Sequence, residues 1–247
     1  MKKSGTKKKK RPKHRASPGP RQPNPRYAAI SQKEKETVME IIQAGRTGEK
    51  AREVGLSAQI WTDHALRQFE WTNALPRPIA CTPGCDHCCH NQVEVAPPEA
   101  LVIGHFLERL LPPEERDRFL AKLGTWLEAT AGKSKEEIAR LRRELPCPLL
   151  QEHRCSAYPV RPLVCRAMHS LDAGQCEASL RAGDLTSGAY YAERHDLVLA
   201  IVHGLQAGCQ ALNCQSGILD LAQALQDYFR RPEPGERWIK GEAVFSL

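Results

Sequence analysis

The chain has 247 residues, enough for one large domain or two small ones, and its 41% hydrophobic and 26% charged residues allow most of it to fold around a core. The longest uninterrupted apolar run is Leu197 to Val202, whereas a membrane-spanning helix needs about 20 residues, so the sequence predicts no such helix. The basic N-terminus is not followed by an apolar stretch, which argues against a secretory signal.

The net charge of +7 is unevenly distributed along the chain. Residues 1–26 hold eleven Lys and Arg and no acidic residue, while the remainder holds 25 Lys and Arg against 29 Asp and Glu, a net of −4. We therefore expect a disordered polybasic tail over residues 1–29, because such a segment cannot bury enough apolar area to offset the entropy of ordering. The run Lys7, Lys8, Lys9, Lys10 and Arg11 suits non-specific binding to the phosphates of RNA or ribosomes, with a solvated arm as the alternative.

Apolar spacing predicts a series of helices from residue 30 onward, in a single domain that extends to residue 247. A first helix begins at Ser31 and stops at Gly45, and Leu56, Ile60, Leu66 and Phe69 indicate a second helix that ends before Pro76. Residues 92–96 form a short extended piece, and helices follow over 97–110, 119–127 and 134–145, the last of them begun by a Ser134–Glu137 capping box. Residues 147–176 are irregular, two helices lie near 187–207 and 216–230, and the last ten residues pack back on the body.

Four cysteines fall within nine residues, Cys81, Cys85, Cys88 and Cys89, in the text CTPGCDHCCH. Thiolates this close repel one another unless a metal supplies compensating charge. Pro83-Gly84 is a turn former, which lets the chain curl so that Cys81 and Cys85 face one centre. Ten cysteines without an export signal favour metal ligands in a reducing cytoplasm over disulfides.

A second group of cysteines, Cys147, Cys155, Cys165 and Cys176, lies in a proline-punctuated segment. Its spacing is less diagnostic than that of the first group, but the irregular backbone is typical of a loop folded around a site. Cys209 and Cys214 fall between the last two predicted helices, without such prolines, and are predicted to be structural thiols rather than ligands.

Together the two segments resemble the YkgJ-like cysteine-cluster family, which is described as zinc- or iron-chelating and is known by a CxxCxxCC signature. The resemblance rests on the first four cysteines, on the text CPLL and CSAY that begins at Cys147 and Cys155, and on RPLVCR around Cys165. VEV at 93–95 and PEA at 98–100 also match, and the similarity covers about residues 78–180. One departure is the three-residue gap between Cys81 and Cys85, where the short signature has two. The resemblance implies metal chelation and a cytoplasmic location, and it does not imply a reaction.

The eight clustered cysteines could hold two zinc ions with four cysteine ligands each, or one or two iron–sulfur clusters, and we favour an iron–sulfur cluster as the native state. The spacing of Cys81, Cys85 and Cys88 is also that of radical SAM enzymes, but the alternating strands of their barrel are not evident. His87 and His90 are predicted to support the site rather than to ligate.

Arg161 and Arg166 flank Cys165, where they could donate to cluster sulfurs or hold an anionic substrate, and a surface salt bridge is the alternative. Tyr158 is a candidate for the same surroundings or for simple core packing.

The sequence therefore predicts a mostly α protein, with a helical domain whose two cysteine-rich loops surround a metal site. Its expected function is metal binding. Two alternatives stay open: a cluster-dependent enzyme, such as a transferase related to the flagellin lysine N-methylase that some relatives resemble, and an RNA- or ribosome-associated factor with a structural metal. No glycine-rich nucleotide loop or Ser–His–Asp constellation favours the enzyme.

Overall fold

The computed structural model describes residues 24–183 and 188–246. These residues form ten α-helices, two short 3-10 helices and four strands of two residues each, which confirms the predicted mostly α architecture. None of the described helices is long and apolar enough to cross a membrane. The tail residues Lys7, Lys8, Lys9, Lys10 and Arg11 lie outside the described residues.

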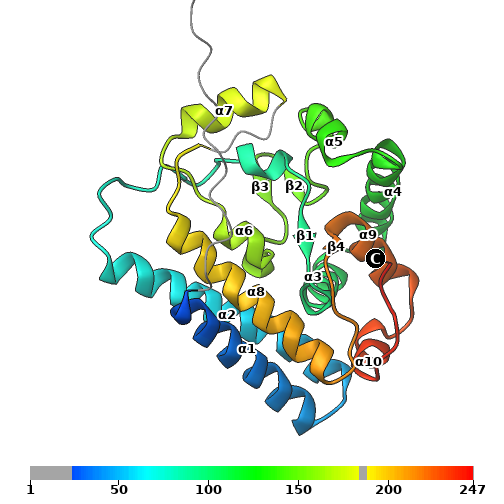
Figure 1. Ribbon diagram of the computed structural model, residues 1–247. Coiled ribbons are helices and arrows are strands. Elements are labelled where there is room, and N and C mark those ends of the chain that lie inside the picture. Colours follow the sequence, from blue (N-terminus) through cyan, green and yellow to red (C-terminus); the bar gives the residue numbers. More distant parts are fainter. Residues whose placement is uncertain (1–23, 184–187, 247) are drawn as a thin grey trace, which may run out of the picture.

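Helix α1 (Pro25–Ala44) lies along helix α8 (Ala192–Ala211) on one side of the molecule (Figure 1). Two glycines of α8 make this close approach feasible. A side chain at Gly204 would begin 2.3 Å from the carbonyl oxygen of Ser31, and one at Gly208 would begin 2.6 Å from Cβ of Val38. At these two glycines the backbone of α8 therefore packs directly against α1, whose Val38 and Ile42 side chains are fully buried.

Helix α1 begins at Pro25, earlier than the Ser31 expected, so residues 25–29 are not part of a disordered tail. The Asn24 side chain accepts a hydrogen bond from the Arg26 amide, and proline suits the first helical turn. Tyr27 and Ile30 pack against the core, and this apolar contact offsets the cost of ordering the first turn. The predicted stop at Gly45 is confirmed.

Helix α2 (Gly48–Thr72) packs on α8, on α3 (Pro97–Leu110) and on α10 (Pro234–Ile239). Its buried face carries small residues together with Leu66 and Phe69. Leu56 and Ile60, which also indicate this helix in the sequence, are exposed, whereas Ala51, Val54 and Ala58 are buried. Helix α3 approaches closely at Gly55, where a side chain would begin 2.5 Å from the Pro98 carbonyl oxygen.

On the opposite side of the molecule, α4 (Pro113–Thr130) and α3 pack on α9 (Leu221–Arg230) (Figure 1). Strand β1 (Glu94–Val95) pairs antiparallel with β4 (Leu219–Asp220) and joins the two halves of the chain. The capping box of Ser134 and Glu137 is confirmed, although helix α5 (Lys135–Leu141) ends before the expected Leu145. The C-terminal residues pack back as predicted, with Trp238, Val244 and Phe245 buried.

Most of the cysteine-bearing segments lie between these two sides, and α7 (Ala173–Ala182) lies at the outer edge of the molecule (Figure 1). These segments comprise the 3-10 helix η1 (His87–His90), strands β2 (Leu150–Gln151) and β3 (Arg154–Cys155), the 3-10 helix η2 (Tyr158–Val160), α6 (Leu163–Ala167) and α7. Strands β2 and β3 form an antiparallel hairpin that pairs Leu150 with Cys155. Helix α7 was not predicted, because its ten residues bury only Ser179 and so carry no apolar stripe.

Candidate metal centre

The first cysteine segment is shaped by a tight turn. The Cys85 amide donates to the carbonyl of Thr82 at 3.0 Å, and Gly84 adopts the left-handed conformation at φ +89°. Glycine takes up this conformation without strain. The turn predicted at Pro83-Gly84 is thereby confirmed, and it leads directly into η1, which carries Cys88 and Cys89.

A backbone hydrogen bond connects the two cysteine segments. The Cys147 amide donates to the carbonyl of Cys89 at 2.8 Å, and the Leu150 amide donates back to the Cys147 carbonyl at 2.9 Å. The β2–β3 hairpin then presents Cys155, while α6 and α7 carry Cys165 and Cys176.

The electrostatic influence of the thiols on one another shows which cysteines are neighbours. Burial and then the nearby Cys81, Cys88 and Cys176 raise the pKa of Cys85. Burial and then Cys147, Cys88 and Cys155 raise the pKa of Cys165 well above its ordinary value. Cys88 belongs to both neighbourhoods and is hydrogen-bonded to the Cys89 side chain. All eight cysteines singled out in the sequence therefore have a thiol neighbour among the eight, and they form two groups that share Cys88.

Most of these thiols have raised pKa values, so their ionisation is unfavourable unless a cation binds. The hydrogen bond to Cys89, followed by burial, raises the pKa of Cys88, and burial raises the pKa of Cys147 to about 12. Within the described part of the chain, no three His, Cys, Asp or Glu side chains converge closely enough to hold a metal ion. The gathered thiols nevertheless have the donor chemistry of zinc or an iron–sulfur cluster, and a bound cation would offset the cost of ionising them.

The two arginines beside Cys165 have different surroundings. Arg166 is buried, and its guanidinium contacts the Asp63 carboxylate and the carbonyls of Pro159 and Arg161. Arg161 lies 4.2 Å from the ring centre of Tyr158, and its charge lowers the pKa of Cys88 and Cys155 against the effects that raise them. The Arg161 Nε is buried and has no hydrogen-bond partner within the described residues. Arg161 is thus the arginine that faces the thiols, while Arg166 holds the loop.

Histidines of both cysteine segments lie near one carboxylate, that of Asp86. Asp86 lies 2.8 Å from Nδ1 of His153 in the β2–β3 turn and 3.8 Å from Nε2 of His90. His90 Nδ1 is 2.9 Å from the Arg142 carbonyl, so both of its ring nitrogens face polar partners. His87 differs, because its Nδ1 is buried without a hydrogen-bond partner in the described structure.

Two charged residues that the sequence did not single out position the second segment. The Glu99 carboxylate, fully buried at the start of α3, accepts the Ala96 amide at 2.8 Å and the Leu163 amide at 2.7 Å. Since Leu163 begins α6, Glu99 fixes the helix that carries Cys165. Lys122 of α4 donates to the carbonyls of Pro148 and Leu150, on either side of the Cys147 turn. A first-turn glutamate signals a capping role, but no local pattern reveals its second, distant partner.

Cys209 and Cys214 lie apart from this centre. Cys209 is buried in the last turn of α8 rather than in a connection, and Cys214 is buried beside the carbonyl of Ile239. Burial raises the pKa of both thiols. Their positions fit the packing role that the sequence predicts.

These features are typical of a cysteine-cluster metal-binding domain. Residues 80–193 match the family described as "CxxCxxCC: Putative zinc- or iron-chelating domain", which confirms the resemblance seen in the sequence. No curated protein and no solved structure matches the chain significantly.

Proposed function

We propose that the two cysteine segments together bind the metal of this chelating domain. The observation that carries the proposal is the junction between them, where the Cys147 amide donates to the Cys89 carbonyl and Cys88 neighbours thiols of both groups. One group comprises Cys81, Cys85, Cys88 and Cys176, and the other joins Cys88 and Cys89 to Cys147, Cys155 and Cys165. Each group has at least the four thiols that a tetrahedral all-cysteine centre needs.

An iron–sulfur cluster is our preferred occupant. The donor set is rich in sulfur, and the imidazole of His90 faces Asp86 and a carbonyl rather than the thiols. Arg161 would balance part of the thiolate charge and offer its Nε–H to a ligand sulfur, while zinc would suit the same thiolates. A reducing cytoplasm, the location we expect, would keep these cysteines as thiols.

The identity of the metal is tested by absorption spectroscopy and metal analysis of the full chain purified without oxygen. We expect iron and sulfide, with visible absorption bands that disappear on chelation. The C209S/C214S double variant is the matched control and should keep the wild-type metal content. Stoichiometric zinc and a colourless protein would refute the iron–sulfur assignment but not thiol ligation. Loss of one metal in the control would contradict the structural role of this pair.

An enzymatic role is a second candidate, because a cavity of about 210 Å³ adjoins the thiols. Cys88, Cys176 and His87 line it together with the ring pair of His169 and Tyr190. His169 is fixed there, since its Nε2 accepts the Tyr191 amide at 2.9 Å and its Nδ1 lies 2.9 Å from the Ala167 carbonyl. A small substrate could reach the metal from this side.

Binding to RNA or ribosomes through the tail is proposed from charge alone. The eleven basic residues within 1–26 would release counterions from phosphates, whereas the remaining chain, at −4, would repel them. Deleting residues 1–26 should abolish binding to a mixed RNA sample and leave the metal content unchanged. A salt titration should show the full-length chain losing affinity steeply. Equal binding by the truncated chain would place the affinity on the folded body instead.

A further inference from the structure

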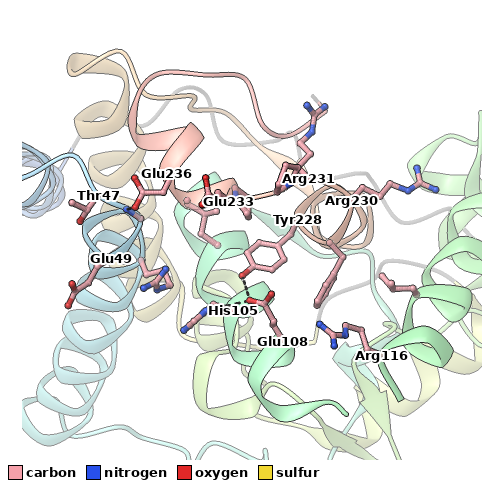
Figure 2. A pocket seen from close by; sticks show the side chains of 18 of the residues that line it. Thr47, Glu49, His105, Glu108, Arg116, Tyr228, Arg230, Arg231, Glu233 and Glu236 are labelled. Carbon is pink, nitrogen blue, oxygen red and sulfur yellow. Dashed lines mark hydrogen bonds and ion pairs between the residues drawn. The ribbon is translucent and has the colours of Figure 1, made fainter. Parts of the chain in front are cut away.

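A second cavity, of about 1030 Å³, lies where four helical elements meet, away from the cysteines. The start of α2, the middle of α3, the first turns of α4 and the α9–α10 connection line it (Figure 2). Its floor is built around Tyr228. A side chain at Gly104 would begin 2.4 Å from the Tyr228 ring, so the glycine provides the space in which that ring lies. The position of the tyrosine hydroxyl is consequently fixed.

Three polar groups meet at this floor. The Tyr228 hydroxyl donates to Oε2 of Glu108 at 3.0 Å, and Nδ1 of His105 lies 3.7 Å from the same oxygen (Figure 2). Burial, followed by the charge of the neighbouring Arg52, lowers the pKa of His105, which disfavours the charged form of its imidazole. Glu108 and His105 therefore offer hydrogen-bond acceptors to a bound molecule.

Arginines of the same cavity have no carboxylate partner. Arg52 and Arg116 are half-buried, and neither guanidinium makes an ion pair or hydrogen bond with any described residue. Figure 2 shows Arg116 extending toward Glu108, whereas Arg230 and Arg231 project away from Tyr228. The charge of Arg52 acts on both His105 and Tyr228, which places it beside the polar floor.

Glu108 is the acidic residue nearest to Arg116, and no acidic residue of the cavity makes an ion pair with either arginine in the described structure. Glu236 accepts the Gly48 amide and faces Lys240. Glu49, Asp117 and Glu233 are exposed, so water screens their charge. A half-buried guanidinium is matched best by a planar or tetrahedral oxyanion, which it can bind in a bidentate way.

We propose that this cavity binds a phosphorylated small molecule that carries hydroxyl groups. Arg52 and Arg116 hold the phosphate, while Glu108 and His105 accept hydrogen bonds from the hydroxyls. Leu101, Leu120 and Phe229 provide the apolar wall beside them. This proposal is independent of metal binding, because no cysteine lines the cavity.

The test is calorimetric titration of the full-length, metal-loaded protein with pyrophosphate, ATP and glucose 6-phosphate, combined with hydrogen exchange. The basic tail will also attract anions, so every variant keeps it. R52Q and R116Q should each weaken pyrophosphate binding about tenfold or more. The control R118Q, on the exposed face of α4, should stay within twofold of the wild type. Binding should also protect amides of α2, α3 and α9.

Two further outcomes decide the proposal. E108Q should bind pyrophosphate several-fold more tightly, because a like charge beside the phosphate is removed. ATP or glucose 6-phosphate should bind more tightly than pyrophosphate in the wild type, and whichever does so identifies a nucleotide or a sugar phosphate as the source. If R52Q, R116Q and the wild type bind pyrophosphate equally, or exchange is unprotected in these helices, the anion binds to the tail and the proposal is wrong. If neither hydroxyl-bearing compound exceeds pyrophosphate, the hydroxyl contacts are refuted.

Discussion

Glu34 is a carboxylic acid buried in the contact between α1 and α8. Its side chain is 1% exposed, and neither oxygen has a hydrogen-bond partner among the residues described. Burial raises its pKa from 4.5 to about 7, and the titratable group that faces it from α8 is Cys209. Since an unpaired buried charge is costly, the protonated form is the one that suits the folded state.

The stability of the protein should therefore depend on pH through Glu34. Below pH 4.5 the group is protonated in both states and costs nothing; as the pH rises to about 7 only the unfolded chain ionises, and folding loses about 3 kcal/mol. Denaturant unfolding between pH 5 and 8 should show this loss in the wild type. E34Q should lack it, while E40Q, at an exposed position of α1, should keep it. An E34Q profile parallel to that of the wild type would contradict the raised pKa.

At the scale of elements, the pairing of α1 with α8 depends on the missing side chain of Gly204. A Cβ there would lie 2.3 Å from the Ser31 carbonyl oxygen, which belongs to the α1 backbone and cannot move alone. G204A should destabilise the fold by about 1–3 kcal/mol, as overpacked cores do, despite the better helix propensity of alanine.

The matched control is Gly124 in α4, where an added Cβ would meet nothing within 4 Å. In urea titrations of both variants, G124A should stabilise the protein by up to about 1 kcal/mol. If the two variants have equal stability, the close helix contact is not what Gly204 provides.

The elements also show where sequence patterns were sufficient. Long amphipathic helices such as α3 and α4 were predicted because their apolar residues recur with the helical period. In α2 the large apolar residues Leu56 and Ile60 are exposed while Ala51 and Ala58 are buried, so side-chain size does not reveal which face of this helix packs. Helix α7 has no apolar stripe, so no pattern indicates it. Helix α8 continues through Cys209, where Val38 packs on Gly208, and this contact between distant parts of the chain is not visible in the sequence.

In the candidate centre, too, local features could be predicted from the sequence and contacts between distant residues could not. Short cysteine spacings indicate candidate ligands, and Pro83-Gly84 predicts the turn at Gly84, because those features are local in the chain. The groups that arrange the ligands are not local. Glu99 reaches Leu163, and Asp86 reaches His153, 64 and 67 positions away, so no periodicity or motif could identify them. Long-range hydrogen bonds of this kind emerge only when the helices are packed together.

At the scale of the whole molecule, helices flank the cysteine segments on two sides (Figure 1). The β1–β4 pairing, Glu99 and Lys122 hold these segments against the helices. A metal bound by both segments would offset the charge of the thiolates, so its binding should add to the stability of the folded state. A metal held by one segment alone would stabilise only that segment.

The measurement that tests joint binding most directly is metal content per chain in C85S and C165S, with C214S as the control. One serine lies in the first segment and one in the second. If both segments bind the metal together, C85S and C165S should lose metal to a similar extent, at least half of the wild-type content, and their melting temperatures should fall toward that of the chelated wild type. Full metal retention by C165S, with loss in C85S, would show that the first segment binds the metal on its own.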